Sequence, residues 1–508
     1  MQRHRQAGRL LSLSILIGLF MGCGGNDAPM PSKVPVRENQ KSTATKLPAP
    51  TNDASVPTQK SNTTNSKPVS NAVPVQPTPS KPESIKTTAT PQQVYLPRDD
   101  RPKHNDSELA TVGINVFESK HIKLYSDIDS EIAAGLPPIV DALFVDLENY
   151  FGKLPPTRSG APYQMTGYLM ADKARYADLG LLPKQDLGSF HGRQIGRRFW
   201  MHDQTSSYYR KHLMLHEATH CYMQAIPGVV APYWYLEGMA ELFGTHREKA
   251  DGGFEFRVFP DDSKSFPGHG RIRLAQREMK KNGFARLQSI TDFTANQFAK
   301  RNECYAWAWV LCSFLDKHNT YRERFRELGQ YTTSARFNQS FRESFNADYQ
   351  NLLAEWTVFA SGIDDNFDFR RAAMSLKSGQ PLTTETHVCE VKADQGWQST
   401  SIRIQKNTPY RIQATGQFTV AQEPKPWISE ADGISIQYFD SRPLGQLLGV
   451  VYNAETTKAD AFAKPIPIGS DRILTPEHDG TLYLRINDRW SQLRDNTGKL
   501  KIAISKVH

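Results

Sequence analysis

The chain of 508 residues has few cysteines, and they form no recognisable pattern. The five are Cys23, Cys221, Cys304, Cys312 and Cys389. Their spacing contains no Cys-x-x-Cys pair, so the sequence predicts no disulfide framework. Cysteine usage therefore says little about the compartment in which the protein works.

A concentrated run of basic residues is also missing. The formal charge is +9 at pH 7, which by itself would suit an anionic partner. The lysines and arginines are spread along the chain, however, and no cluster of them is interleaved with aromatic residues in the way typical of nucleic-acid binding. We therefore expect no nucleic-acid partner.

Large apolar residues are scarce in one long region near the N-terminus. Hydrophobic residues make up only 38% of the chain, and residues 24–108 consist mainly of Pro, Ser, Thr, Asn, Lys and Gln. Such a segment cannot bury enough surface to offset the conformational entropy lost on folding. The sequence predicts a disordered tether there.

Ahead of the tether, residues 1–23 have the pattern of an export signal. A basic start with Arg3, Arg5 and Arg9 precedes an apolar stretch from Leu10 to Met21, shorter than the roughly 20 residues that span a bilayer. The ending Gly22-Cys23 resembles a bacterial lipoprotein signal, which implies a lipidated Cys23 and an exported, membrane-anchored protein. The alternative is a plain cleaved signal that leaves Cys23 free.

The rest of the chain divides into two folded regions. Residues 109–365 contain strand patterns followed by many helical ones, which predicts an α+β domain. Residues 366–385 are a connector. Residues 386–508 contain seven short alternating strands with turn residues between them, which predicts an all-β sandwich.

The α+β region carries the motif His-Glu-x-x-His at residues 216–220. Positions i and i+4 lie on one face of a helix, so His216 and His220 can share one zinc ion. Glu217 can then reach water at the metal and act as general base. His212 is on the same stripe, but two turns separate it from His220, about 12 Å along the helix, so it is a neighbour and not a third ligand.

A carboxylate from the next helix is the expected third ligand. The metzincin pattern requires Gly and His where this chain has Met223 and Ile226, so that class is excluded. Glu237 suits the role. Glu241, one turn further on, would accept a hydrogen bond from a metal-binding imidazole and so hold it in the correct tautomer. The reverse assignment, with Glu241 as ligand, stays open.

The segments HEATH and WYLEGMAE resemble the gluzincin metallopeptidases, in particular their exported bacterial members. The resemblance covers roughly residues 110–365 and implies zinc on His216, His220 and Glu237, with Glu217 as general base. It also aligns Tyr305 with a catalytic tyrosine that donates to the oxyanion. The alternative is that Tyr305 is an aromatic residue of a buried helix.

The same resemblance bears on the substrate. The Gly-x-Met-Glu-Asn strand with which aminopeptidases hold a substrate amino terminus is absent from this sequence. We therefore expect an endopeptidase acting on a protein or peptide.

The C-terminal region contains the segments Gly396-Trp-Gln-Ser-Thr, Ala414-Thr-Gly, Pro443-Leu-Gly-Gln-Leu-Leu, Leu484-Arg-Ile-Asn-Asp and Asp495-Asn-Thr-Gly. In these segments it resembles the galactose-binding, calcium-dependent bacterial lectins of the A type. The resemblance implies calcium bound by the side chains of Asp488, Asp495 and Asn496, with backbone ligands near Gln492 and Val420. Oxygen ligands suit this hard cation. Ser429 and Asp432 stand where the family has its sugar-contacting His and Gln, so the sandwich is expected either to bind a glycan or to hold calcium for stability alone. The Asp and Asn residues could also be ordinary turn residues.

Two functions follow. The first is an exported, membrane-tethered zinc peptidase with a lectin-like accessory domain. The second is a non-catalytic surface protein whose sandwich binds carbohydrate or cell-wall polymer. The complete set of His216, Glu217, His220 and Glu237 favours the first.

Overall fold

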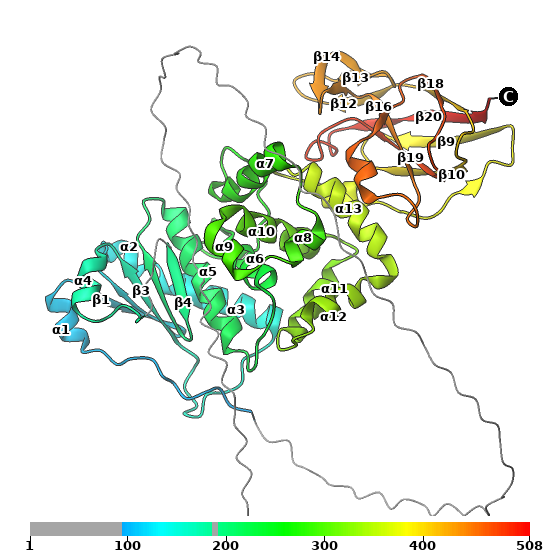
Figure 1. Ribbon diagram of the computed structural model, residues 1–508. Coiled ribbons are helices and arrows are strands. Elements are labelled where there is room, and N and C mark those ends of the chain that lie inside the picture. Colours follow the sequence, from blue (N-terminus) through cyan, green and yellow to red (C-terminus); the bar gives the residue numbers. More distant parts are fainter. Residues whose placement is uncertain (1–93, 185–190, 508) are drawn as a thin grey trace, which may run out of the picture. The chain divides into compact units, whose positions relative to one another are not determined.

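The computed structural model describes residues 94–184 and 191–507 (Figure 1). The expected signal, Cys23 and most of the expected tether lie outside these residues. Within them, no helix is both long enough and apolar enough to cross a membrane.

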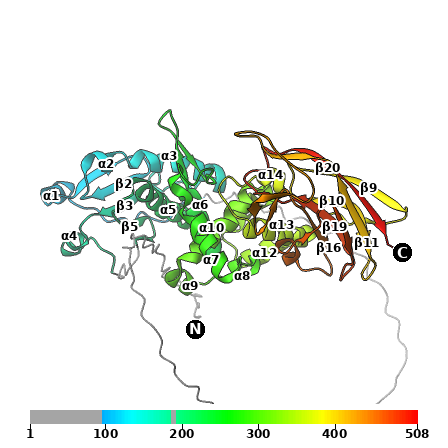
Figure 2. The same cartoon turned by 90° about the horizontal axis from the view of Figure 1, so that it is seen from above.

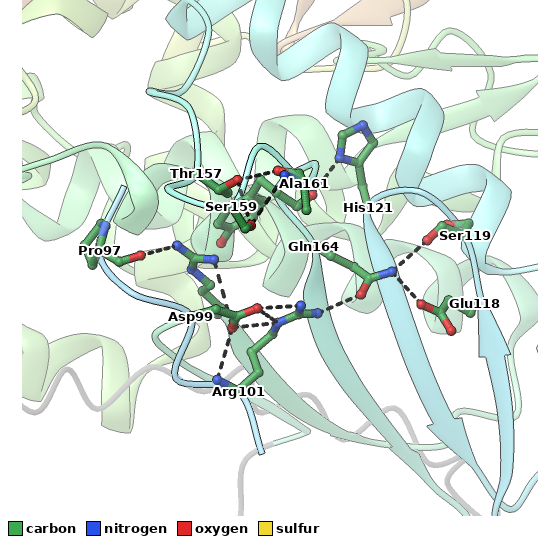
Figure 3. Close-up of polar contacts among 12 residues, drawn as sticks. Pro97, Asp99, Arg101, Glu118, Ser119, His121, Thr157, Ser159, Ala161 and Gln164 are labelled. Carbon is green, nitrogen blue, oxygen red and sulfur yellow. Dashed lines mark hydrogen bonds and ion pairs between the residues drawn. The ribbon is translucent and has the colours of Figure 1, made fainter. Parts of the chain in front are cut away.

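The folded part begins earlier than residue 109, the expected start. Leu96 is buried, and its amide donates to the carbonyl of Pro156 at 3.0 Å. Figure 3 shows the neighbouring polar contacts, in which Arg101 donates to both Asp99 and Gln164. Helix α1 (Asp106–Thr111) then follows, capped by the Asn105 side chain. The composition of residues 94–108 resembles the tether, but one buried leucine and these polar contacts hold the segment on the domain.

The N-terminal half of the α+β region is built on a five-stranded sheet. Its order is β1-β2-β3-β5-β4, with β2, β3 and β5 parallel and the two outer strands antiparallel to their neighbours. The strands are β1 (Asn115–Glu118), β2 (Ile122–Ser126), β3 (Met165–Met170), β4 (Gly192–Ile195) and β5 (Arg198–His202). The helices of this half are α2 (Ser130–Ala134), α3 (Pro137–Phe151) and α4 (Lys173–Asp178). Strand β4 is therefore an edge of this sheet.

Two helices carry the sequence motifs. Helix α5 (Ser207–Ala225) begins at Ser206, whose hydroxyl accepts from the Tyr209 amide, and it ends just before Pro227-Gly228. The sequence predicts that Pro232 starts the next helix, and helix α6 (Tyr233–Gly244) begins directly after it. Figure 2 shows α5, α6 and α10 side by side in the middle of this region. Both motif helices are almost entirely buried, because they form the centre of the main hydrophobic core.

Helix α10 (Asn302–Lys317) packs very closely against α6. A Cβ at Gly238 would lie 2.6 Å from the sulfur of Cys312 and 2.7 Å from the carbonyl oxygen of Ala308. Only glycine allows this approach, which brings Tyr305 near the motif. The sequence predicts one helix over 294–318, but the chain breaks it at Arg301, whose backbone is extended, so that α9 (Ala295–Lys300) and α10 are separate.

The remaining elements complete the helical half. They are β6 (His246–Glu248), β7 (Phe254–Phe256), η1 (Pro267–His269), α7 (Gly270–Asn282), α8 (Leu287–Thr291), α11 (Arg322–Glu327), η2 (Leu328–Tyr331), α12 (Phe337–Ser344), η3 (Asn346–Asp348), α13 (Tyr349–Ser361) and α14 (Phe369–Ala372). The five strands of the main sheet precede the motif helices, as predicted, but the short pair β6 and β7 follows them, so the second half is not purely helical.

The C-terminal region is rich in β-structure, as predicted. One sheet has the order β17-β16-β19-β10-β8, and a second has the order β13-β12-β20-β11-β18 with β9 also paired to β20. Apolar residues of both sheets, such as Ile404 and Leu484 from the first and Ile412 and Ile502 from the second, share one core. Two sheets around one core make a sandwich.

Its strands outnumber the seven predicted, because several are too short to show alternation. They are β8 (Gln380–Pro381), β9 (Thr386–Lys392), β10 (Gln398–Ile404), β11 (Tyr410–Thr415), β12 (Phe418–Ala421), β13 (Trp427–Ser429), β14 (Ile434–Phe439), β15 (Arg442–Leu444), β16 (Leu447–Tyr452), β17 (Ile466–Pro467), β18 (Asp471–Leu474), β19 (Gly480–Ile486) and β20 (Thr497–Lys506), with η4 (Ala459–Ala463) among them.

Candidate metal and catalytic site

Three side chains from α5 and α6 converge on one point. Nε2 of His216 lies 3.0 Å from Nε2 of His220, and each lies 3.4 Å from Oε2 of Glu237. Four ligands arranged tetrahedrally around zinc at about 2.0–2.1 Å stand about 3.3–3.4 Å apart. The triangle has the dimensions of one face of such a tetrahedron. Among the described residues, these three form the one cluster of His, Cys, Asp or Glu compact enough to hold a metal ion.

The charge state of the triangle also suits a cation. All three residues are buried, and neither oxygen of Glu237 has a hydrogen bond among the described residues. Burial alone would raise the pKa of Glu237, but the imidazoles of His220 and His216 outweigh burial and hold it at about 2. An ionised carboxylate buried without hydrogen bonds is costly unless a cation accompanies it.

Glu241 lies on the other side of His216. Its Oε1 is 3.3 Å from Nδ1 of His216, and its Oε2 is 3.0 Å from Nε2 of His212. Since Nδ1 faces Glu241, Nε2 of His216 is the nitrogen left for a metal. The geometry therefore favours Glu237 over Glu241 as the third ligand, and it places His212 on Glu241 and outside the triangle.

Glu217 lies between α5 and the edge strand β4. A Cβ at Gly192 would lie 2.4 Å from Oε1 of Glu217, so the glycine makes room for this carboxylate. Burial is the main reason that the pKa of Glu217 rises to about 8, and Glu237 and Glu241 add to the rise while His216 opposes it. A divalent cation beside it would favour the ionised form again.

Tyr305 forms part of the wall of the site. Its ring centroid lies 6.4 Å from that of His216 and 5.0 Å from that of Phe298. The residue is buried at the start of α10. The structure thus places Tyr305 beside the triangle, a position that suits either of the two roles considered for it.

Two residues next to the site, Gly192 and Arg271, belong to no motif of the sequence. Gly192 comes from a strand far ahead of the motif, and Arg271 of α7 donates two hydrogen bonds to Glu241, at 2.6 and 2.7 Å. Neither residue belongs to a pattern of fixed spacing with the motif. No signal in a single sequence would have marked them.

In the sandwich, the three expected calcium ligands lie in one turn region after β19. Nδ2 of Asn496 donates to Oδ2 of Asp488 at 2.8 Å. Oδ1 of Asp495 and Oδ1 of Asn496 are buried without a hydrogen-bond donor among the described residues. Burial raises the pKa of Asp488 to about 6. Buried oxygens without donors, next to a carboxylate, are what a hard cation would satisfy.

Ser429 and Asp432, the two positions expected to correspond to sugar contacts, have partners within the sandwich. The hydroxyl of Ser429 donates to the backbone oxygen of Glu430, and Oδ1 of Asp432 accepts from the Ser470 amide. Both side chains therefore make local contacts within the sandwich.

Comparisons with known proteins identify no family for this chain. No family model and no curated protein matches the chain. A solved structure described as "EclA N-terminal domain; PllA-like lectin" matches with 18% identity over 24% of this chain and 95% of that one, at a TM-score of 0.19. A likeness of this size is too weak to assign a fold or a function.

Proposed function

We propose that the chain is an exported, membrane-tethered zinc endopeptidase. The observation that carries the proposal is the convergence of His216, His220 and Glu237 in a triangle of zinc-like dimensions, with Glu217 beside it. Export and anchoring through Cys23 rest on the sequence pattern of residues 1–23.

Each side chain would have a defined task in peptide hydrolysis. Zinc, when bound, would lower the pKa of water towards about 7 and polarise the scissile carbonyl. Glu217 would take the proton from the attacking water and pass it to the leaving amine. Tyr305 would donate a hydrogen bond to the developing oxyanion.

Strand β4 lies directly beside the proposed base. In the sheet, it pairs with β5 and lies at the end of the strand order. Its residues Gly192, Arg193 and Gln194 are buried. Because Gly192 adjoins Glu217, this strand limits the space that the carboxylate of the proposed base can occupy.

The experiment uses the purified full-length chain. We expect about one zinc per chain by elemental analysis, and cleavage of an unfolded protein such as casein that a chelator abolishes. Glu217→Gln should retain zinc and lose cleavage, whereas Glu237→Ala should lose zinc as well. Glu323→Gln, an exposed change on α11, is the matched control and should behave as the unaltered chain. A Glu217→Gln variant with full activity would overturn the assignment.

A second function, glycan or cell-wall binding by the sandwich, is favoured by the unsatisfied oxygens of Asp495 and Asn496. Under this alternative, the α+β region would be a non-catalytic support. Calorimetry should show one Ca²⁺ site that Asp495→Ala removes. A glycan array probed with and without Ca²⁺ tests whether the sandwich binds a sugar and whether that binding requires calcium. Zinc-free protein without proteolysis, combined with calcium-dependent glycan binding, would favour this second function.

A further inference from the structure

Arg271 is joined to the candidate metal site through a single buried carboxylate. The Glu241 side chain is 0% exposed. It accepts hydrogen bonds from Nε and from one terminal nitrogen of the Arg271 guanidinium. Nε of Arg271 donates to Oε2 at 2.7 Å, and a terminal nitrogen donates to Oε1 at 2.6 Å. This two-point geometry fixes the plane of the carboxylate as well as its position.

Each oxygen of that carboxylate also faces one imidazole. Oε1 faces Nδ1 of His216 at 3.3 Å, and Oε2 faces Nε2 of His212 at 3.0 Å. Glu241 is therefore surrounded by nitrogen atoms in a fixed pattern, with one guanidinium nitrogen and one imidazole nitrogen close to each oxygen. Rotation of the carboxylate would break several of these contacts together.

The guanidinium reaches a second part of the site as well. The Cζ atom of Arg271 lies 5.9 Å from the ring centroid of Tyr305, within the range of a cation–π contact. One arginine thus donates hydrogen bonds to the carboxylate next to His216 and also lies over the aromatic ring of Tyr305. Arg271 is the second residue of helix α7, which follows directly after η1.

We propose that Arg271 is a positioning residue of the metal site, which holds the Glu241 carboxylate so that His216 presents Nε2 to the metal. The inference rests on the proposed zinc function and adds a residue to it. Partners that orient metal-binding histidines typically contribute about 10- to 100-fold to metal affinity. Arg271 acts one contact further away, so the lower end of that range applies.

Arg271→Lys is the informative change, because lysine keeps the positive charge and loses the planar two-point contact. Zinc affinity of the full-length chain is measured by competition with a chromophoric chelator. We expect about a 10-fold weaker affinity and a changed visible absorption spectrum of the Co²⁺-loaded protein, since that spectrum reports ligand geometry. Arg277→Lys, an exposed change on the same helix, should alter neither.

A double-mutant cycle shows whether Arg271 works through Glu241. In a Glu241→Gln background, Arg271→Lys should change zinc affinity by less than about twofold. An equal loss in both backgrounds, or an Arg271→Lys variant with unaltered affinity and Co²⁺ spectrum, overturns the inference while the zinc site stands. An unaltered chain that binds no zinc overturns the proposed function and the inference together. The melting temperature of the metal-free variants separates misfolding from loss of positioning.

Discussion

The substitution Gly192→Ala would disturb the contact between strand β4 and Glu217, the proposed base. The added methyl group would lie 2.4 Å from Oε1 and 3.1 Å from Cδ of Glu217, where ordinary contacts are 3.4 Å or more. The carboxylate must therefore move by about 1 Å, and the Cδ1 atom of Leu213 also crowds the added methyl group, at 3.1 Å. The three atoms nearest to the added methyl group belong to Glu217 and Leu213, and to none of the three proposed zinc ligands.

The size of the effect follows from that displacement. A misplacement of about 1 Å at a reacting group can cost about 100-fold in rate, equivalent to about 2.7 kcal/mol of transition-state stabilisation. We expect Gly192→Ala to lower the kcat for casein or a quenched fluorescent peptide by about that factor. Overpacking should also lower the free energy of unfolding, by about 1–3 kcal/mol.

The assay compares three proteins under the same conditions. Zinc content and melting temperature are measured together with kcat, because the argument requires a folded, metal-loaded variant. Gly270→Ala is the control, since a Cβ there meets nothing within 4 Å. A Gly192→Ala variant with zinc bound and activity within twofold of the unaltered chain would refute the placement of Glu217 as base.

Further outcomes concern other parts of the molecule. Tyr305→Phe should lower kcat by about 100-fold with zinc affinity unchanged if its hydroxyl stabilises the oxyanion; an unaltered kcat would leave Tyr305 a packing residue. Burial lowers the pKa of His246 to about 4, so its contribution to stability is present above pH 6.5 and is lost as the pH falls through 4. His246→Asn, which keeps a donor for the Gly244 carbonyl, should reduce the fall in unfolding free energy between pH 7 and pH 4 by up to about 3 kcal/mol in denaturant titrations; an unchanged slope would contradict this. Ca²⁺ at 100 times its dissociation constant should stabilise the sandwich by about 2.7 kcal/mol, and Asp495→Ala should abolish the shift in melting temperature; a shift that survives this change would place the ion elsewhere.

Much of the helical core of the site was predictable, because its signals are local. The spacing of His216 and His220 puts both imidazoles on one face of any helix, and Pro232 marks the start of the second helix. Alternation of apolar residues likewise predicts the longer strands of the sandwich. It misses short strands such as β13 and β17, which contain too few residues to show a period.

Boundaries depended on contacts that the sequence does not display. The segment from Val94 reads as tether by composition, yet a single buried leucine and a few hydrogen bonds hold it on the domain. The break at Arg301 divides a region whose apolar spacing is continuous. In both cases tertiary packing overrides a weak local preference.

The sequence by itself therefore determined the residues of the motif, their faces on two helices and the division into an α+β region and a β-rich region. Only the tertiary structure decided that Glu237 lies with the two histidines while Glu241 faces Nδ1 of His216. It alone also showed that Gly192 adjoins Glu217. The hydrogen bonds from Arg271 to Glu241 likewise come from the tertiary structure alone. The physical reason is that helix and strand periods specify which way a side chain faces along its own element. Distances between elements are set by how whole surfaces pack, and no spacing in the chain records them.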